Sequence, residues 1–326
     1  MGDVATAMGL WRARGQRPVA CRDGSGCWVV HEHLSYVRLP TALGAPDDAA
    51  SRELHWHRFA PLVSYAEPAA ADGHDANALF YVCSDAAYDV ERLSRKARRD
   101  VRHGLRSVTV RRMDFDELAR RGHPALADTC GRNRMAASTP VTFAADCRLR
   151  GRFATEAAWG AFADDEVCAW VTTHRVGANV DLGAVAMVWE RRSLCATYAL
   201  VYEVVRSALR DTGAAQVGYG LSSLQRESRA ASLHQFKTWL GFEAFPVRRI
   251  FEPHPLLRPL VLRPLLDLAG RALARVPESR FTNKLRGALD LMRGGSPVAV
   301  ATAGHAPSPT APGEPAGESP GEHDHV

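Results

Sequence analysis

Two runs rich in β-branched and aromatic residues lie next to each other in the second half of the sequence. EVCAWVTTHRV occupies residues 166–176, NVDLGAVAMVW occupies residues 179–189, and only Gly177 and Ala178 separate them. Two such runs joined by a short connection that contains glycine predict a β-hairpin. This hairpin belongs to the part of the sequence with the most regular pattern of strands and helices.

The segments after the hairpin alternate between helix and strand. ATYALVYEVVRSALRDTG predicts a helix that ends at Gly213, and AAQVGYGL and FEAFPVRRIF predict two strands. Between these strands, SLHQFKTWLGF predicts a helix that begins at a capping box of Ser232 and Gln235 and ends at Gly241. The order is therefore strand, strand, helix, strand, helix, strand, without an internal repeat.

A basic helix is predicted upstream, in RLSRKARRDVRHGLR at residues 92–106. Apolar residues recur every four positions and would form one stripe, made by Leu93, Ala97, Val101 and Leu105. The segment also holds seven Arg or Lys residues against the single Asp100. Most of these charges are interpreted as a solvated face, and Arg95, Arg98 and Arg99 are the candidates for binding phosphate.

Composition restricts the class of protein. The chain has 326 residues, of which 46% are hydrophobic, and no apolar stretch approaches the roughly 18 to 20 residues needed to cross a bilayer. The N-terminus lacks the pattern of a secretory signal, so a cytoplasmic location is expected. Seven Cys residues occur singly, and no metal site is predicted. The formal charge is +5 overall and +9 over residues 1–293, which favours a phosphate-bearing partner.

Four regions are expected. Residues 1–90 are interpreted as a divergent β-rich part, and residues 91–252 as the main α/β domain. Residues 253–293 contain HPLLRPLVLRPLLDLAGRALARV, a helical extension that is expected to dock on the body rather than to rest on an anionic membrane surface. Residues 294–326 are rich in Pro and Gly, lack aromatic residues, and are predicted to be a disordered tail.

The element order together with FKTWLGF resembles the GNAT acyltransferase superfamily, and RKARRDVRHGL upstream of FKTWLGF is similar to its FemAB-related, BioF2-like branch. The resemblance covers roughly residues 78–250. It implies an α/β fold with a GNAT-like mixed sheet flanked by helices. It also implies an acyltransferase that uses acyl-CoA as co-substrate and acts on a small-molecule or peptide amine.

In GNAT proteins, the turn before the helix that follows the central strand holds the diphosphate of acyl-CoA. The matching residues here are the cofactor-binding candidates Arg191, Arg192, Ser193 and Ala196. Leu194 stands where the family pattern has glycine, which weakens the inference of CoA binding. The dipole of the following helix and the two arginines could still hold a phosphate.

Lys237 occupies the position of the family's catalytic tyrosine. FemAB-like enzymes have the dipeptide Phe-Lys at this place, which Phe236 and Lys237 match. The resemblance implies that Lys237 stabilises charge in the reacting complex, with Phe236 as the wall that orients it. Independently of the family, a fixed cation beside the tetrahedral oxyanion of acyl transfer lowers the barrier. The alternative is a lysine that extends from an amphipathic helix to solvent.

Further candidates are weaker. Tyr219, between two glycines at a strand end, could donate a proton or cap the sheet, and Asp181 could act as base for the amine. Ser222 and Ser223 are candidates for substrate binding, as are Arg98 and Arg99 in the basic helix.

Three hypotheses remain for the function. The first is transfer of an acyl group from acyl-CoA to an amine. The second is FemAB-like aminoacyl transfer from charged tRNA, which the leucine at position 194 and the basic helix favour. The third is a non-catalytic module that binds nucleic acid or lipid phosphate through the basic helix and shows strongly salt-dependent binding.

Overall fold

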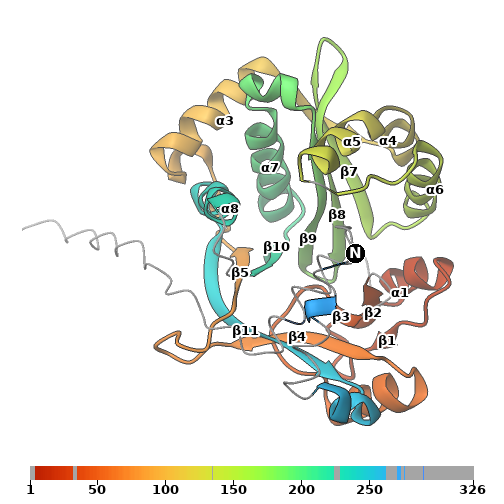
Figure 1. Ribbon diagram of the computed structural model, residues 1–326. Coiled ribbons are helices and arrows are strands. Elements are labelled where there is room, and N and C mark those ends of the chain that lie inside the picture. The colour runs from red at the N-terminus through yellow and green to blue at the C-terminus, as the bar shows by residue number, and fades with distance from the viewer. Residues whose placement is uncertain are drawn as a thin grey trace, which may run out of the picture.

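The computed structural model describes residues 4–31, 35–133, 135–223 and 228–261, together with residues 270–272, 275 and 289. Its strands form one mixed sheet in the order β1-β2-β3-β4-β11-β5-β10-β9-β8-β7-β6 (Figure 1). The strands are β1 (Val19–Ala20), β2 (Cys27–His31), β3 (Ser35–Leu39), β4 (Leu62–Pro68), β5 (Ala78–Cys83), β6 (Thr109–Met113), β7 (Glu156–Ala163), β8 (Glu166–Val176), β9 (Asn179–Met187), β10 (Gln216–Ser223) and β11 (Glu243–Pro253).

Helices flank this sheet. The α-helices are α1 (Val4–Ala13), α2 (Asp48–Arg52), α3 (Arg95–Ser107), α4 (Phe115–Arg121), α5 (His123–Arg132), α6 (Pro140–Arg150), α7 (Ala196–Arg206) and α8 (Ser228–Trp239). The shorter segments are η1 (Glu53–His57) and η4 (Ser207–Asp211), which are π-helical, and η2 (Val90–Arg92), η3 (Trp189–Leu194) and η5 (Pro255–Val261), which are 3₁₀-helical.

The hairpin predicted from the sequence is confirmed. Strands β8 and β9 are antiparallel, Val176 pairs with Asn179, and Gly177 in the turn has a φ of 58°. The predicted helix ends are also correct, since Gly213 and Gly241 have φ values of 61° and 84° that favour glycine.

The predicted capping box at Ser232 is wrong. Helix α8 begins at Ser228, so Ser232 lies inside the helix rather than at its start. The sequence contains the capping pattern, but the helix begins one turn earlier, at Ser228. The residues just before Ser232 are therefore already helical.

Two apolar cores lie on opposite faces of the sheet. On one face, α3, α7 and α8 pack over β7 to β10, and on the other α4, α5 and α6 pack over β7 and β8 (Figure 1). Gly104 lets α3 lie against α7, because a Cβ atom there would meet the carbonyl oxygen of Cys195 at 2.7 Å. The alternation of side chains along a strand decides which core each residue enters.

The N-terminal part is β-rich, as predicted, but it also contains helices that the sequence did not predict. Strands β1 to β4 hold a small core around Trp28 and Leu54, to which α2 and η1 contribute. Helix α1 buries Ala7 and Leu10 and contacts β2, β8 and α6. It therefore lies between the two halves of the chain.

Strand β5 joins the halves. It precedes α3 in the chain but lies between β10 and β11, antiparallel to both, with Cys83 opposite Val217 and Val82 opposite Glu243. One continuous sheet thus passes through the predicted boundary at residue 90. The division into regions stays a prediction.

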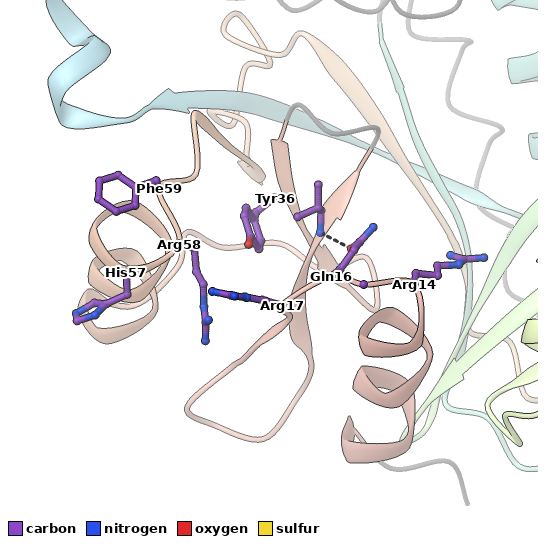
Figure 2. Close-up of a pocket in the computed structure, with 9 residues that line it drawn as sticks. Arg14, Gln16, Arg17, Tyr36, His57, Arg58 and Phe59 are labelled. Carbon is purple, nitrogen blue, oxygen red and sulfur yellow. Dashed lines mark hydrogen bonds between the residues drawn. The ribbon is translucent and has the colours of Figure 1, made fainter.

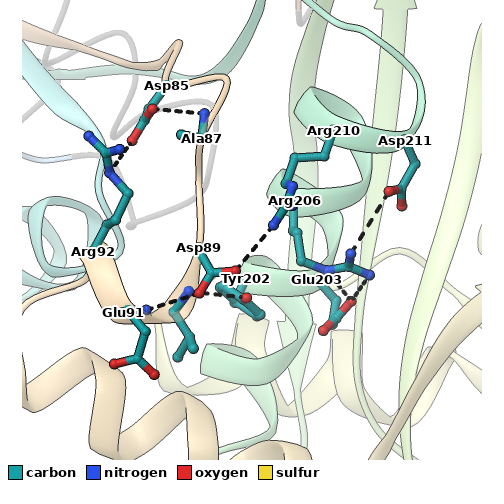
Figure 3. A network of polar contacts seen from close by, with 11 residues as sticks. Asp85, Ala87, Asp89, Glu91, Arg92, Tyr202, Glu203, Arg206, Arg210 and Asp211 are labelled. Carbon is teal, nitrogen blue, oxygen red and sulfur yellow. Dashed lines mark hydrogen bonds and ion pairs between the residues drawn. The ribbon is translucent and has the colours of Figure 1, made fainter.

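Polar contacts fasten the segment after β5 to α7 and η4 (Figure 3). A guanidinium nitrogen of Arg210 lies 3.1 Å from Asp89, and the backbone N–H of Val90 donates to the hydroxyl of Tyr202 at 3.2 Å. These contacts hold the segment that leads into α3 against α7 and η4, in the same core.

No helix in the described residues is long and apolar enough to cross a membrane. Of the predicted extension at 253–293, the structure describes the start, which forms η5, and a few later residues. The predicted tail at 294–326 lies outside the described residues.

Candidate active site

The side chain of Lys237 lies in a cage of aromatic and polar groups between α8 and the sheet. Its Nζ donates hydrogen bonds to the carbonyl oxygen of Tyr219 at 3.1 Å and to Ser222 Oγ at 3.0 Å. The same nitrogen lies 4.1 Å from the ring centroid of Tyr81 and 4.6 Å from that of Tyr219. Only 3% of Lys237 is exposed, so its ammonium group is held rather than solvated.

A bulge in β10 makes the carbonyl group of Tyr219 available to Lys237. The register between β10 and β5 shifts between Gly218 and Leu221, and Gly220 has a φ of 67°. A bulge leaves residues of one strand outside the ladder, so their backbone groups need other partners. Glycines on both sides of Tyr219 were thus the sequence signal of an irregular strand whose backbone contributes to the site.

Burial dominates the electrostatics of Lys237. Desolvation lowers the pKa of its ammonium group from 10.5 to about 8. Within the part of the chain that the structure describes, no carboxylate lies within ion-pair distance of Nζ to oppose this effect. Lysine is an uncommon choice here, because only three of the 41 Lys and Arg residues are Lys. Unlike Arg, Lys can exchange a proton near neutral pH when it is buried.

Two members of the cage were not identified from the sequence. Tyr81 on β5 shares a hydrogen bond of 2.9 Å with His234 Nδ1, and burial raises the pKa of the Tyr81 hydroxyl to about 12. His234 is three residues before Lys237 and therefore lies on the same side of α8. The sequence signal for Tyr81 was only an apolar strand, because nothing in it indicated that β5 would enter the sheet beside β10.

Phe236 forms part of the wall of the site. Its ring contacts Tyr198 edge-on at a centroid distance of 4.9 Å and Tyr219 at 6.5 Å. The structure thus brings together Lys237, Phe236, Tyr219 and Ser222, four residues that the sequence had named as separate candidates. Their catalytic and substrate-binding roles stay predictions. The side chain of Ser223 lies outside the described residues.

Asp181 lies on the opposite face of the sheet from Lys237. Its neighbours Val180 and Leu182 enter the core under α7, whereas its own carboxylate accepts a hydrogen bond of 2.7 Å from the backbone N–H of Thr41. Burial raises the pKa of Asp181. His174 on the neighbouring strand β8 pairs in register with Asp181, so the two side chains lie on the same face of the sheet.

The strands that carry these groups part at the site. Parallel β9 and β10 are paired over three positions, and the last pair is Asp181 with Gly218. Tyr219, the next residue of β10, carries the carbonyl oxygen that accepts from Lys237. Lys237 and Asp181 therefore flank the point where the two strands separate, from opposite faces of the sheet.

The predicted CoA-binding residues Arg191 and Arg192 both lie within η3, where nearby groups contact them. Arg191 forms an ion pair of 2.7 Å with Glu166. The guanidinium group of Arg192 lies 4.8 Å from the ring centroid of Trp189, and the carbonyl oxygen of Ser193 accepts from His103 at 3.0 Å. Both arginines are near the start of α7, but Arg191 contacts Glu166 and Arg192 contacts Trp189.

The first turn of α7 has a distinctive backbone. Cys195 precedes it with a φ of 52°, and no side chain caps the helix. Ala196, the first residue of the helix, is buried. An uncapped helix start is a favourable place for an anion. The role of these residues in binding a cofactor stays a prediction.

The candidates for phosphate binding on α3 are also paired. Arg98 donates to the carbonyl oxygens of Glu91 at 2.5 Å and Leu93 at 3.3 Å, and Arg99 forms an ion pair of 3.0 Å with Asp100. The side chain of Arg99 is largely exposed although Asp100 is buried. Phosphate binding by Arg98 and Arg99 stays a prediction.

Solved structures share the architecture. The crystal structure of FemX superposes with a TM-score of 0.57 at 11% identity, over 79% of this chain and 94% of FemX. The C-terminal domain of a putative lysylphosphatidylglycerol synthetase from Agrobacterium fabrum superposes with a TM-score of 0.50 at 11% identity, over 76% of this chain and 87% of that domain. The chain has a FemX-like fold.

The GNAT-like, FemAB-related fold expected from the sequence is thereby confirmed. A tandem GNAT protein from the clavulanic acid biosynthesis pathway also aligns, at 11% identity and a TM-score of 0.38, over 70% of this chain and 79% of that protein. No family model matches the sequence, and no curated protein matches it. At such low identity the likeness concerns the fold, and the activity must be argued from the site.

Proposed function

We propose that this protein transfers an acyl group from acyl-CoA to an amine, with Lys237 as the cation at the reacting centre. The observation that carries the proposal is the enclosed Lys237, which has two hydrogen-bond acceptors, two tyrosine rings and a pKa lowered to about 8 by burial. Perturbed titratable groups of this kind are concentrated at functional sites. A lysine that only supported the fold would not need to be desolvated without a carboxylate partner.

The chemistry needs what this geometry supplies. The amine nitrogen attacks the thioester carbonyl carbon, negative charge develops on the carbonyl oxygen, and the carbon–sulfur bond then breaks. An N–H of Lys237 would donate to that oxygen, or would give its proton to the departing thiolate, and a pKa of about 8 suits both tasks near neutral pH.

The acceptor must also lose a proton. Asp181 flanks the same parting point of β9 and β10 from the other face, and its raised pKa makes it a better base than an exposed carboxylate. A donor carbonyl group held between the two strands would have Lys237 on one side and Asp181 on the other. We therefore assign Asp181 the role of accepting the proton of the amine.

The uncapped start of α7 supports the choice of acyl-CoA as donor. Its first-turn N–H groups, with Arg191 and Arg192 beside them, could hold the diphosphate of CoA. The amine acceptor is of small-molecule or peptide class.

A second candidate is aminoacyl transfer from charged tRNA. Leu194 replaces a glycine that would let CoA approach, and Arg191 is held by Glu166. The named relatives in fold include a putative lysylphosphatidylglycerol synthetase, whose product carries an aminoacyl group. A tRNA donor would use the exposed basic side chains of α3 rather than the start of α7.

Thermal unfolding with and without acetyl-CoA and longer acyl-CoAs tests the donor. A ligand at about 100 times its dissociation constant adds roughly 2.7 kcal/mol, which shifts the melting temperature measurably. We expect the shift to shrink in Arg192→Ala and to persist in Arg120→Ala, an exposed arginine on α4. No shift with any acyl-CoA, together with transfer from charged tRNA to an amine, would replace the first candidate by the second.

A non-catalytic module, the third hypothesis from the sequence, makes a different prediction. Binding of nucleic acid through α3 would fall steeply with salt and would survive Lys237→Ala. Amine acylation that depends on Lys237 would rule this hypothesis out as the main function.

A further inference from the structure

Large apolar side chains lie exposed together at one end of the molecule, away from α8 (Figure 1). Trp56 is 49% exposed, Phe59 69% and Leu256 67%, and Leu257 is also exposed. They come from the η1 region and from η5, which are about 200 residues apart in the chain and adjacent in Figure 1. We name these four residues the His254 patch, because each of them contacts that histidine, Trp56 and Phe59 through their rings and the two leucines through their backbone N–H groups.

His254 gives the patch a fixed base. Its ring lies 5.2 Å from Trp56 and stacks on Phe59 at 6.0 Å, measured between ring centroids. The backbone N–H groups of Leu256 and Leu257 donate to its Nδ1 at 3.1 Å and to its carbonyl oxygen at 2.7 Å. His254 itself is buried. The exposed side chains therefore project from an ordered support.

Phe59 pays a conformational cost for its position. Its φ is 50°, a left-handed conformation that is unfavourable for an aromatic residue. Such strain persists only where the surroundings enforce it, and it is concentrated at functional sites. At Phe59 the strained backbone presents an aromatic ring to solvent, so burial of the ring within the protein does not offset the strain.

A basic cavity adjoins the patch and shares Phe59 with it (Figure 2). The cavity has a volume of about 440 Å³, and the charged or polar side chains that line it include Arg14, Arg17, Tyr36, His57 and Arg58. Tyr36 is buried, and the positive charges of Arg58 and Arg17 both act on its hydroxyl group.

The charges of the cavity are only partly balanced. Arg14 pairs with Asp146 at 2.6 Å, and Arg58 pairs with Glu53 at 2.7 Å. Within the described ranges, Arg17 has no carboxylate partner, and the buried Nε of Arg58 has no hydrogen-bond acceptor. An anion with several oxygen atoms, such as a phosphate group, fits such an unbalanced pair of guanidinium groups.

We propose that the His254 patch and the adjoining arginine cavity form one surface that docks on an anionic phospholipid bilayer. The apolar side chains enter the boundary between headgroups and acyl chains, and the cavity holds a lipid phosphate. Aromatic side chains beside Arg are typical of such interfaces, where each part satisfies a different layer of the bilayer.

This surface is separate from the candidate active site, so the inference does not depend on the proposed transferase activity. The alternative occupant of the patch is the chain's own segment 262–293, which continues from η5. Charge complementarity favours the membrane, because the cavity beside the patch holds Arg17, which has no carboxylate partner among the described residues.

Co-sedimentation with vesicles tests the proposal on the full chain. The wild type should bind vesicles of phosphatidylcholine and phosphatidylserine in equal amounts and should not bind vesicles of phosphatidylcholine alone. The double variant Trp56→Ala with Phe59→Ala and the single variant Arg17→Glu should each lose about tenfold in binding or more. Two control variants, Phe245→Ala on β11 and Arg120→Glu on α4, should bind vesicles within about twofold of the wild type. Both residues are exposed and lie outside the proposed docking surface.

The melting temperature of each variant completes the test. Because the substituted side chains are exposed, it should remain unchanged, and Leu256→Ser serves if the double variant does not fold. A lower melting temperature with unchanged vesicle binding would mean that segment 262–293 covers the patch, which overturns the proposal. Absence of binding to anionic vesicles would overturn it too. Stabilisation by inorganic phosphate that Arg17→Glu abolishes would then identify a site for a free phosphate.

Discussion

Lys96 on α3 and Lys237 on α8 have similar aromatic surroundings and opposite electrostatics. Lys96 Nζ lies 4.6 Å from the ring centroid of Trp239 and 5.5 Å from that of Tyr198, and Lys237 Nζ lies 4.1 and 4.6 Å from two tyrosine rings. Lys96 is partly exposed and pairs with Asp100 at 2.8 Å, whereas Lys237 is buried.

The pKa values of the two lysines move in opposite directions. The hydrogen bond that Lys96 donates to Asp100 raises the pKa of Lys96, and desolvation lowers the pKa of Lys237 to about 8. Aromatic rings alone therefore do not determine how a lysine behaves. Access to water and a carboxylate partner decide whether the cation is a structural contact or a group that can take part in chemistry.

The largest expected difference between the two lysines is in turnover. Lys237→Ala should lower kcat by about 100- to 1,000-fold, because it removes a fixed donor to the developing oxyanion. Lys96→Ala should change kcat by less than about threefold, since that lysine contacts α8 from the outside. Steady-state kinetics of amine acylation measures both, and equal rates in the two variants would remove Lys237 from the mechanism.

The next effect is on the pH dependence of stability. Between pH 8 and 10.5 the unfolded chain keeps the proton of Lys237 and the folded chain releases it, so the free energy of unfolding rises with pH through this window. The contribution of this one group is about 3 kcal/mol in total. Urea unfolding of the wild type and of Lys237→Met at a series of pH values isolates it as the difference between the two curves.

That difference should be absent for Lys96→Met below pH 10.5, because the pKa of Lys96 is raised rather than lowered. A flat difference for Lys237→Met over the same range would show that Lys237 is not desolvated.

A third prediction concerns stability at neutral pH. Lys237→Met should raise the free energy of unfolding by about 1 to 3 kcal/mol at pH 7, because Met fills the space without the cost of burying a charge. Lys96→Met should leave it unchanged or lower it by up to about 1 kcal/mol, since it breaks the pair with Asp100. Chemical denaturation checks both, and destabilisation by Lys237→Met would identify the lysine as structural.

The smallest expected effect is that of Tyr81→Phe. It removes the hydrogen bond between Tyr81 and His234 but keeps the ring next to Lys237, so stability should fall by about 0.5 to 1.5 kcal/mol. Thermal unfolding measures the loss. The fall in kcat should be much smaller than in Lys237→Ala, and a comparable fall would make the Tyr81 hydroxyl a member of the reacting groups.

Local signals account for the parts of the fold that the sequence predicted correctly. The hairpin of β8 and β9 needs only its two-residue connection, and the ends of the two following helices need only the glycines at 213 and 241. Lys237, Tyr219 and Ser222 were each named as candidates from the sequence, and the structure places them in contact.

Long-range packing accounts for the parts that were not predicted. Tyr81 enters the site because β5 inserts between β10 and β11, and no local pattern in ALFYVC specifies that partner choice. Asp181 is on the opposite face from Lys237 because of its register on β9, which depends on the pairing of the strands. The ion pair of Arg191 with Glu166 is likewise made by residues 25 positions apart, whose proximity arises only on folding.

The sequence by itself determined the identity and order of the elements from the hairpin to β11, since turns, caps and apolar periodicity act over a few residues. It also identified Lys237 as the residue most exceptional for its place. The tertiary structure alone decided that this lysine is desolvated and has two tyrosine rings beside it. It also gathered Trp56, Phe59 and Leu256 around His254. The physical reason is that burial and electrostatic environment are properties of many residues distant in the chain, so they exist only once the sheet is assembled.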